Sequence, residues 1–333
     1  TRNFLRQQSG INLLRNSSSL GFGKSNNMGV SAAMGEWLLF LNNDLVLTQN
    51  WFSPFENVIK NSSKWRHLGC LGNVQVDPRT KRVDHSGITF KEGHPTHFGL
   101  GSKMMGGDGY SEYLAVTGAC FMVRRDIFLQ AGGFDEEFKT GFEDIDLCLR
   151  LRMLGYRHFV ANSSVIYHKR SSTPERNEHQ AHNSRVFYGR WSSLITRFQE
   201  WERLNQSKEL GRSVRKYQSY VTQNSESFLF AEEKLLSDHF LRFLNAKHFL
   251  YAEKLLKIFE DNRFDSLKSV VLKVKLLRAQ KKYAKARHEI QNFPNCNNQP
   301  ILLWELAEVE KEAGNYALAR KTFSKLIKRK YRV

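Results

Sequence analysis

The sequence predicts an α/β domain followed by an all-α domain of helical repeats. Two patterns lead to this prediction. Up to about residue 170, short apolar runs bounded by Gly, Asn and Asp alternate with segments of helical spacing, as strands and helices do in α/β layers. Beyond residue 215, an aromatic residue stands three positions before an alanine in three places, 33 or 34 residues apart. A chain of 333 residues, 41% of them hydrophobic, is long enough for two domains with separate cores.

The expected elements of the first domain alternate along the chain. The expected strands are residues 11–14, 36–41, 68–76, 82–90, 113–123 and 159–168. The expected helices are residues 1–8, 24–34, 51–60, 124–131 and 142–154, several of them ended by glycine. The nearly unbroken apolar run at 36–41 predicts a buried strand of a parallel sheet, because such strands are covered on both faces.

Two further segments of this region are distinctive. Residues 93–109 are glycine-rich and contain His94 and His97, and we expect a mobile loop that covers an acceptor. Residues 184–204 place apolar side chains at helical spacing among basic ones. Such an amphipathic helix either packs against the preceding domain, which we favour, or lies on a membrane surface.

The repeated pattern indicates tetratricopeptide-like units. The aromatic–alanine pairs are Phe249/Ala252, Tyr283/Ala286 and Tyr316/Ala319. A period of 33 or 34 residues matches a helix–turn–helix unit, in which a small alanine lets two helices approach closely. A plain helical bundle is the alternative. We therefore expect an α/β domain over 1–182, an amphipathic helical linker over 183–214 and helical repeats over 215–333.

Charge and cysteine content restrict the class of protein. The net charge is +18, of which residues 215–333 carry +11. This favours anionic partners such as nucleotide diphosphates, lipid phosphates or a membrane surface, although a solvated basic face would look the same. Nucleic acid is not an expected partner, since no recognition motif is present. The four cysteines form no C-x-x-C pair, so neither a zinc site nor a redox motif is predicted, and a reduced cytoplasmic chain fits best. No apolar run is long enough to cross a bilayer.

Two groups of acidic residues are candidates for chemistry. Asn42-Asn43-Asp44 follows a predicted strand, where ligands of α/β sheets bind, and Asp44 could hold a divalent cation; a simple turn is the alternative. Glu143, Asp144 and Asp146 stand in the first turn of a predicted helix. A carboxylate there could act as a general base, or the three could cap the helix, with Asp146 paired to Arg150. His168, at the end of the last strand, could join the Asp44 site or be structural.

Four stretches in order resemble glycosyltransferase family 2, especially its bacterial rhamnosyltransferase-like branch. They are residues 20–29 (LGFGKSNNMG), 37–44 (WLLFLNND), 117–125 (TGACFMVRR) and 132–150 (GGFDEEFKTGFEDIDLCLR), the last continuing to His168. Each motif is modestly specific, and the ordered set over about residues 11–170 is strongly so.

The resemblance implies a GT-A fold, a Rossmann-like nucleotide-diphospho-sugar transferase domain, with Mg²⁺ or Mn²⁺ as cofactor. Asn42-Asn43-Asp44 matches the D-x-D metal motif of the family in a degenerate form, and Asp44 and His168 would bind the metal. Asp144 matches the catalytic base of inverting members, with Glu143 and Asp146 shaping the acceptor site. The donor diphosphate would contact Asn26, Asn42, Asn43, Asp44 and Gly118.

The same resemblance implies the substrates. The donor would be a nucleotide sugar, with rhamnose as one candidate, and the acceptor a glycan, a lipid-linked glycan or a protein, in cell-wall or O-antigen synthesis. We expect a cytoplasmic location, at the inner membrane face if peripheral membrane contact occurs, and a protein partner for the repeats. The alternative is an adaptor whose repeats bind a protein while the transferase domain is inert.

One departure from the family pattern concerns the N-terminus. Family members begin with a strand–helix–strand unit whose loops hold the nucleotide base, and the sequence contains no match to it. We therefore expect an N-terminally incomplete or degenerate domain lacking that unit, and weak or no activity for this polypeptide alone.

Overall fold

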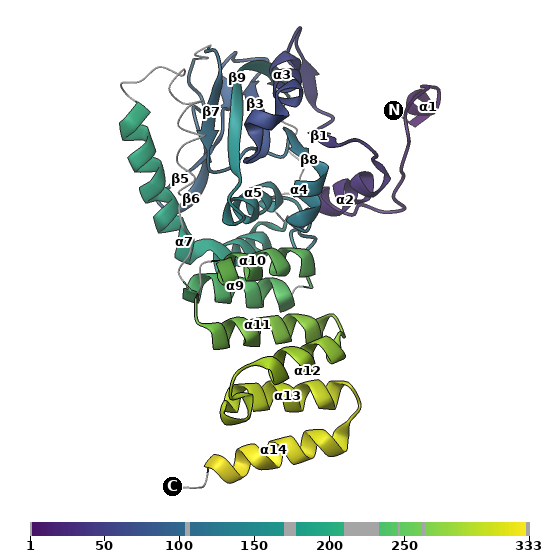
Figure 1. Cartoon of the computed structure of the whole chain (residues 1–333). Helices are drawn as coiled ribbons and strands as arrows, with labels where there is room; N and C mark the ends of the chain where they lie inside the picture. Colours follow the sequence, from purple (N-terminus) through teal and green to yellow (C-terminus); the bar gives the residue numbers. More distant parts are fainter. Residues whose placement is uncertain are drawn as a thin grey trace. The chain divides into compact units, whose positions relative to one another are not determined.

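A computed structural model describes residues 2–103, 107–169, 178–209, 233–245, 247–261 and 264–330. The chain divides into two compact units, residues 1–227 and 228–333. The first is built on a mixed β-sheet with helices, and the second is all helical (Figure 1). The predicted fold class, an α/β domain followed by an all-α domain, is therefore confirmed.

The first unit contains a seven-stranded sheet in the order β1-β8-β3-β9-β2, with β4 paired to β3 and β7 paired to β9. The two central strands, β3 (Leu68–Val76) and β9 (Arg157–His168), run parallel. The other paired strands run antiparallel: β1 (Trp37–Leu41), β2 (Leu45–Leu47), β4 (Val83–His85), β7 (Tyr110–Tyr113) and β8 (Cys120–Arg124). A separate hairpin joins β5 (Ile88–Lys91) to β6 (His94–His97).

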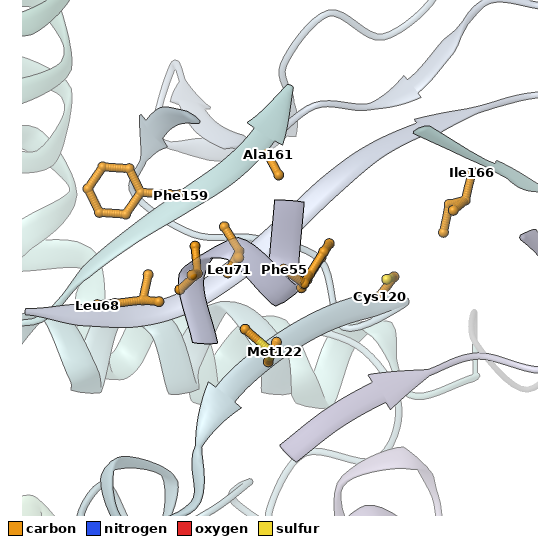
Figure 2. Close-up of a cluster of buried hydrophobic side chains, with 9 residues drawn as sticks. Phe55, Leu68, Leu71, Cys120, Met122, Phe159, Ala161 and Ile166 are labelled. Atoms are coloured by element: carbon orange, nitrogen blue, oxygen red, sulfur yellow. The ribbon is translucent and has the colours of Figure 1, made fainter. Parts of the chain in front are cut away.

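Helices cover both faces of this sheet. On one face, α3 (Ser53–Lys60) inserts Phe55 into a buried apolar cluster with Leu71 and Met122 (Figure 2). Cys70, the neighbour of Leu71 on β3, meets Cys148 of α5 (Glu143–Met153). Because successive strand residues point to opposite faces, α3 and α5 lie on opposite sides of the sheet. Two further helices, α2 (Phe22–Ala32) and α4 (Arg125–Gln130), complete the unit together with the short α1 (Arg2–Arg6).

Near the N-terminus one predicted strand is absent, and another forms but with a different pairing from the one expected. Residues 11–14 have no regular structure, and their large apolar side chains are 43–49% exposed. The strand expected at 36–41 does form, as β1, but it pairs antiparallel with β8 at the end of the sheet path. Leu39 and Leu41 are exposed there. In the described residues β1 has one neighbouring strand, so its unbroken apolar run did not indicate a central parallel position.

Three longer predictions were too simple. The strand expected over 82–90 divides into β4 and β5 at Gly87, which has φ of 112° and no room for a side chain, since an added Cβ would lie 2.2 Å from the Tyr113 ring. The strand expected over 113–123 divides into β7 and β8. The expected loop at 93–109 begins with β6, so its first part is an ordered hairpin strand; residues 104–106 lie outside the described part.

The amphipathic segment belongs to α7 (Gln180–Glu209), which packs on the α/β unit. Phe187 and Trp191 are fully buried, and the Phe187 ring stacks on Phe142 with centroids 4.7 Å apart. These contacts support packing over a membrane-lying role for this part of the helix. The side chains of Phe198 and Trp201 are outside the described part. Among the described helices, none combines the length and apolar character needed to span a membrane.

The second unit contains six consecutive helices in the described residues. They are α9 (Glu233–Asn245), α10 (Phe249–Asp261), α11 (Ser266–Ala279), α12 (Tyr283–Asn292), α13 (Pro300–Glu312) and α14 (Tyr316–Lys330). Each predicted repeat aromatic opens the second helix of a pair, and each alanine is its fourth residue. Ala252, Ala286 and Ala319 are all buried. The helical region is confirmed, whereas its assignment to the tetratricopeptide class stays a prediction.

Candidate active site

Asp44 and His168 meet at the carboxyl end of the central strands. Asp44 lies in the turn that follows β1, and His168 is the last residue of β9. The turn leads into β2, whose Leu45 is paired with His168, and the carbonyl oxygen of Asp44 accepts a hydrogen bond of 3.0 Å from the Lys169 amide. This register brings Asp44 Oδ2 to 3.5 Å from His168 Nε2. An oxygen and a nitrogen donor thus converge where ligands of α/β sheets bind.

Asp84, a third member of this cluster, was missed by sequence reasoning. It lies on β4, its side chain is 6% exposed, and its Oδ2 is 3.0 Å from His168 Nδ1. The one available signal was a charged residue inside a run of strand formers, since a buried carboxylate needs a partner. Which partner it finds depends on strand register, and register was not predicted.

His85, the next residue, reaches a different set of partners. Its Nδ1 is 2.8 Å from Nδ1 of His97, while its Nε2 accepts hydrogen bonds from the amides of Gly87 and Thr117. His97 belongs to the segment expected to be a mobile loop. This part of it is therefore attached to the sheet beside the candidate site.

Asp144 forms the second half of the site. It is the second residue of α5 and is partly exposed. Its Oδ2 accepts a 2.6 Å hydrogen bond from the amide of Gly118, and its Oδ1 accepts one of 2.8 Å from the amide of Ile145. A side chain at Gly118 would crowd this carboxylate, because an added Cβ would lie 3.3 Å from Asp144 Oδ2. These contacts fix the carboxylate in one orientation.

Backbone contacts connect the two halves. The Asn42 amide donates to the carbonyl oxygen of Ala119 at 2.8 Å, beside Gly118. On the other side, the Thr117 amide donates to His85, the neighbour of Asp84. The segment that positions Asp144 is therefore joined to the turn that carries Asp44 and to β4, which carries Asp84. Asp44 and Asp144 lie on the same edge of the sheet.

The other two acids of α5 point into the protein. Asp146 is fully buried: its Oδ2 accepts a 2.7 Å hydrogen bond from Arg150 Nε, and its Oδ1 accepts hydrogen bonds from Arg190 and Trp191. Burial opposes the charge of Arg190, but the carboxylates of Asp146, Asp135 and Glu137 raise its pKa above the ordinary arginine value. The helix pairing of Asp146 with Arg150 that we considered is present, and it leaves Asp146 no free face for a substrate.

Glu143 is also buried, with 5% exposure, and its Oε2 accepts a 2.5 Å hydrogen bond from the Gly141 amide. Both acids therefore make contacts inside the protein at the start of α5, and their role in shaping the acceptor site stays a prediction.

The other residues that were predicted to contact the donor diphosphate lie nearer the protein surface. Asn43 is exposed in the turn, and Asn42 is half-buried. Asn26 donates to the Phe22 carbonyl oxygen one turn earlier in α2. Its neighbour Asn27 makes the longer-range contacts, because its side chain exchanges two hydrogen bonds with the backbone of Phe134. From the sequence, we assigned a contact with the donor to Asn26, whose described hydrogen bond is local, and not to Asn27.

A buried cluster of Cys70, Cys148 and His158 has ligand atoms within 4.8 Å of one another. It does not suit a metal, because both ring nitrogens of His158 are engaged, Nδ1 with the Cys70 amide and Nε2 with the Cys148 carbonyl oxygen. Burial lowers the pKa of His158 to about 3 and raises the pKa of the Cys70 thiol well above its usual value. The two hydrogen bonds of the His158 ring account for this cluster.

Comparison with known proteins places the chain in a family. A family model described as "Glycosyltransferase like family 2" matches residues 3–194. The O-antigen biosynthesis protein RfbC of Myxococcus xanthus is 32% identical over 157 residues, which is 44% of this chain and 12% of that protein. An N-acetylglucosaminyl-diphospho-decaprenol L-rhamnosyltransferase of Mycobacterium tuberculosis is 42% identical over 59 residues, 17% of this chain and 19% of that protein.

One solved structure adds a weaker likeness. The crystal structure of GalNAc-T7 with UDP, GalNAc and Mn²⁺ aligns with a TM-score of 0.37 and 15% identity, covering 46% of this chain and 31% of that chain. The chain spans about a fifth or less of the length of the two curated relatives.

Proposed function

The chain belongs to the glycosyltransferase-like family 2, and from this membership we propose that it transfers a sugar from a nucleotide-diphosphate donor to an acceptor hydroxyl. The observation that supports this most is the joint position of Asp44 and Asp144. One lies beside a nitrogen ligand and the other is a fixed, partly exposed carboxylate, and both occupy the carboxyl edge of the sheet. A metal-bound diphosphate and a general base are needed side by side for such a transfer.

The donor set fits a divalent cation. Asp44 offers a carboxylate oxygen, and His168 offers a ring nitrogen 3.5 Å away. A mixed set of oxygen and imidazole nitrogen favours Mn²⁺ over Mg²⁺, which prefers oxygen ligands alone. When bound, the cation would offset the negative charge that gathers on the leaving diphosphate.

The residues of the chain would act on the acceptor in one displacement. Asp144 accepts the proton of the acceptor hydroxyl, whose oxygen forms a bond to the anomeric carbon of the sugar. The bond from that carbon to the diphosphate oxygen breaks on the opposite face, and the nucleoside diphosphate leaves with the bonding electron pair. The configuration inverts because the exchange is a single in-line step. Gly118 keeps the carboxylate of Asp144 in place through its amide.

The proposal also covers the donor sugar, the acceptor and the role of the helical unit. A deoxyhexose such as rhamnose is the donor sugar that the rhamnosyltransferase relative supports, with a lipid-linked or polysaccharide acceptor. The helical unit would hold the acceptor or a protein partner through its repeats. Its excess of positive charge favours an acceptor that carries phosphate.

Calorimetry with UDP, GDP and dTDP, in the presence and absence of Mn²⁺, tests this proposal. We expect Mn²⁺-dependent binding of one nucleotide, abolished in Asp44→Ala. Asp144→Asn should bind that nucleotide unchanged but lose at least a hundredfold of the hydrolysis of the matching nucleotide sugar, in the range reported for loss of a general base. Glu56→Gln, on the exposed face of α3, is the matched control.

The opposite results have distinct meanings. Binding without Mn²⁺ dependence would remove the metal from the proposal. Unchanged hydrolysis in Asp144→Asn would remove the base assignment. If no nucleotide binds, this polypeptide alone does not transfer a sugar, which is the outcome expected of a domain without the unit that holds the nucleotide base, and the adaptor alternative gains support.

A further inference from the structure

Asp84 is a buried carboxylate that none of the sequence motifs includes. Its side chain is 6% exposed, and it faces His168, which is 15% exposed. Burial of an unpaired charge is costly, so a buried carboxylate needs a hydrogen-bonded partner. The partner here is an imidazole whose other nitrogen points to Asp44.

The sheet explains why these side chains meet. β4 pairs with the last residues of β3, with Val83 opposite Val76, and β9 runs along the other side of β3, with Tyr167 opposite Val76. Asp84 and His168 each follow one of these partners. They therefore reach toward each other across the end of β3, on a rigid part of the fold.

The hydrogen bond decides which nitrogen of His168 is available. A carboxylate oxygen 3.0 Å from Nδ1 accepts the proton on that nitrogen. Nε2 is then the ring nitrogen that remains to bind a cation, and it faces Asp44 Oδ2 at 3.5 Å. A nitrogen and an oxygen at this separation can both bind one divalent cation, whose bonds to such ligands are about 2.1 Å long.

We propose that Asp84 is a positioning residue, which holds His168 in the Nδ1-protonated tautomer so that Nε2 and Asp44 bind one divalent cation. The proposal rests on the metal-dependent function proposed above. In this role Asp84 does not contact the cation. Carboxylates that orient a ligating histidine in this way raise metal affinity about 10–100-fold.

The tautomer is measured first, in the metal-free chain labelled with ¹⁵N-histidine. His168→Gln identifies the His168 signals among the 11 histidines. We expect wild-type His168 to be Nδ1-protonated, and Asp84→Leu, which has no acceptor, to show a mixture of tautomers or the Nε2-protonated form. A wild-type ring protonated on Nε2 would overturn the proposal without any variant.

Mn²⁺ affinity, measured by calorimetry and electron paramagnetic resonance, is the second readout. We expect Asp84→Asn to bind Mn²⁺ about 10–100-fold more weakly. The double variant Asp84→Asn/His168→Gln should bind no more weakly than His168→Gln alone, because the carboxylate acts through the ring. Additive losses would make Asp84 an independent ligand and overturn the proposal, as would unchanged affinity in a folded Asp84→Asn.

These readouts separate the two proposals. If the wild-type chain binds no Mn²⁺ but shows the Nδ1 tautomer that Asp84→Leu disturbs, the metal-dependent function fails, and with it the metal-binding purpose of the Asp84–His168 contact. If Mn²⁺ binds normally and the tautomer does not respond, the function stands and the positioning role of Asp84 is wrong. Glu56→Gln, the exposed acid of α3, is the matched control.

Discussion

Removal of the charge of Asp146 should destabilise the α/β unit more than removal of any exposed acid. Three donors surround this carboxylate: Arg150 Nε on one oxygen, and Arg190 Nη1 and Trp191 Nε1 on the other. In Asp146→Asn the amide NH₂ group faces a donor whichever way the side chain is turned. The substitution also leaves Arg150, which is fully buried, with a charge that water does not reach.

The expected loss is about 3–5 kcal/mol, the usual cost of removing one partner from a buried ion pair. Glu137 provides the contrast. It also pairs with Arg190, at 2.6 Å, but its side chain is 51% exposed. Glu137→Gln should therefore cost at most about 1 kcal/mol, as exposed pairs do.

Urea unfolding followed by tryptophan fluorescence measures the difference. Five of the six tryptophans lie in residues 1–227, so the signal reports mainly on the α/β unit. With an m-value of about 2 kcal/mol per molar, the midpoint should fall by about 2 M in Asp146→Asn. If it falls no further than in Glu137→Gln, the buried charge is not what holds α5 to α7.

Three further predictions concern single sites. Gly118→Ala should lower hydrolysis of the nucleotide sugar about tenfold, because the new Cβ would lie 3.3 Å from Asp144 Oδ2 and displace the carboxylate. His158 has a folded pKa of about 3 against an ordinary 6.5, so the unfolded chain binds the extra proton. The free energy of unfolding, measured with urea, should therefore be about 2 kcal/mol lower at pH 5 than at pH 8. Ala286→Leu should cost about 1–3 kcal/mol in thermal unfolding, because Ala286 is fully buried beside Ile290.

Each of these predictions has a matched control. Gly189→Ala, which meets no atom within 4 Å, should leave hydrolysis unchanged. His158→Gln should flatten the pH dependence between pH 5 and 6.5, whereas His67→Gln, at an exposed site, should retain it. Ala284→Leu, on the exposed side of α12, should cost little. Equal effects in any variant and its control would contradict the corresponding argument.

The sequence predicted best where one local signal decided the structure. Residues 68–76 were predicted as a strand with the limits that β3 has, and all nine are buried, including the polar Asn73 and Gln75. The helix at 142–154 and the strand at 159–168 were also placed to within about two residues. Gly155, which follows α5 and has φ of 87°, marks the end of that helix.

The sequence failed where structure depended on distant contacts. Gly87 breaks a run of strand formers because the Tyr113 ring occupies the space of a side chain, and no local pattern shows this. Asp84 was missed for the same reason, since it joins the site through the register of three strands. β1 has the composition of a central strand but lies at the end of the sheet path, and composition does not specify the number of neighbours.

The separation of roles within α5 was predictable from helix geometry. Asp144 and Asp146 are two residues apart, which is about 200° around a helix, so one cannot share the exposed face of the other. Asp144 turns toward Gly118, and Asp146 turns toward α7. A loss of activity in an Asp146 variant would therefore resemble the loss of a catalytic group while it reflects a displaced or unfolded α5. Activity expressed per folded molecule separates the two, since folded Asp146→Asn should keep its nucleotide affinity and recover hydrolysis at low temperature, whereas Asp144→Asn should not.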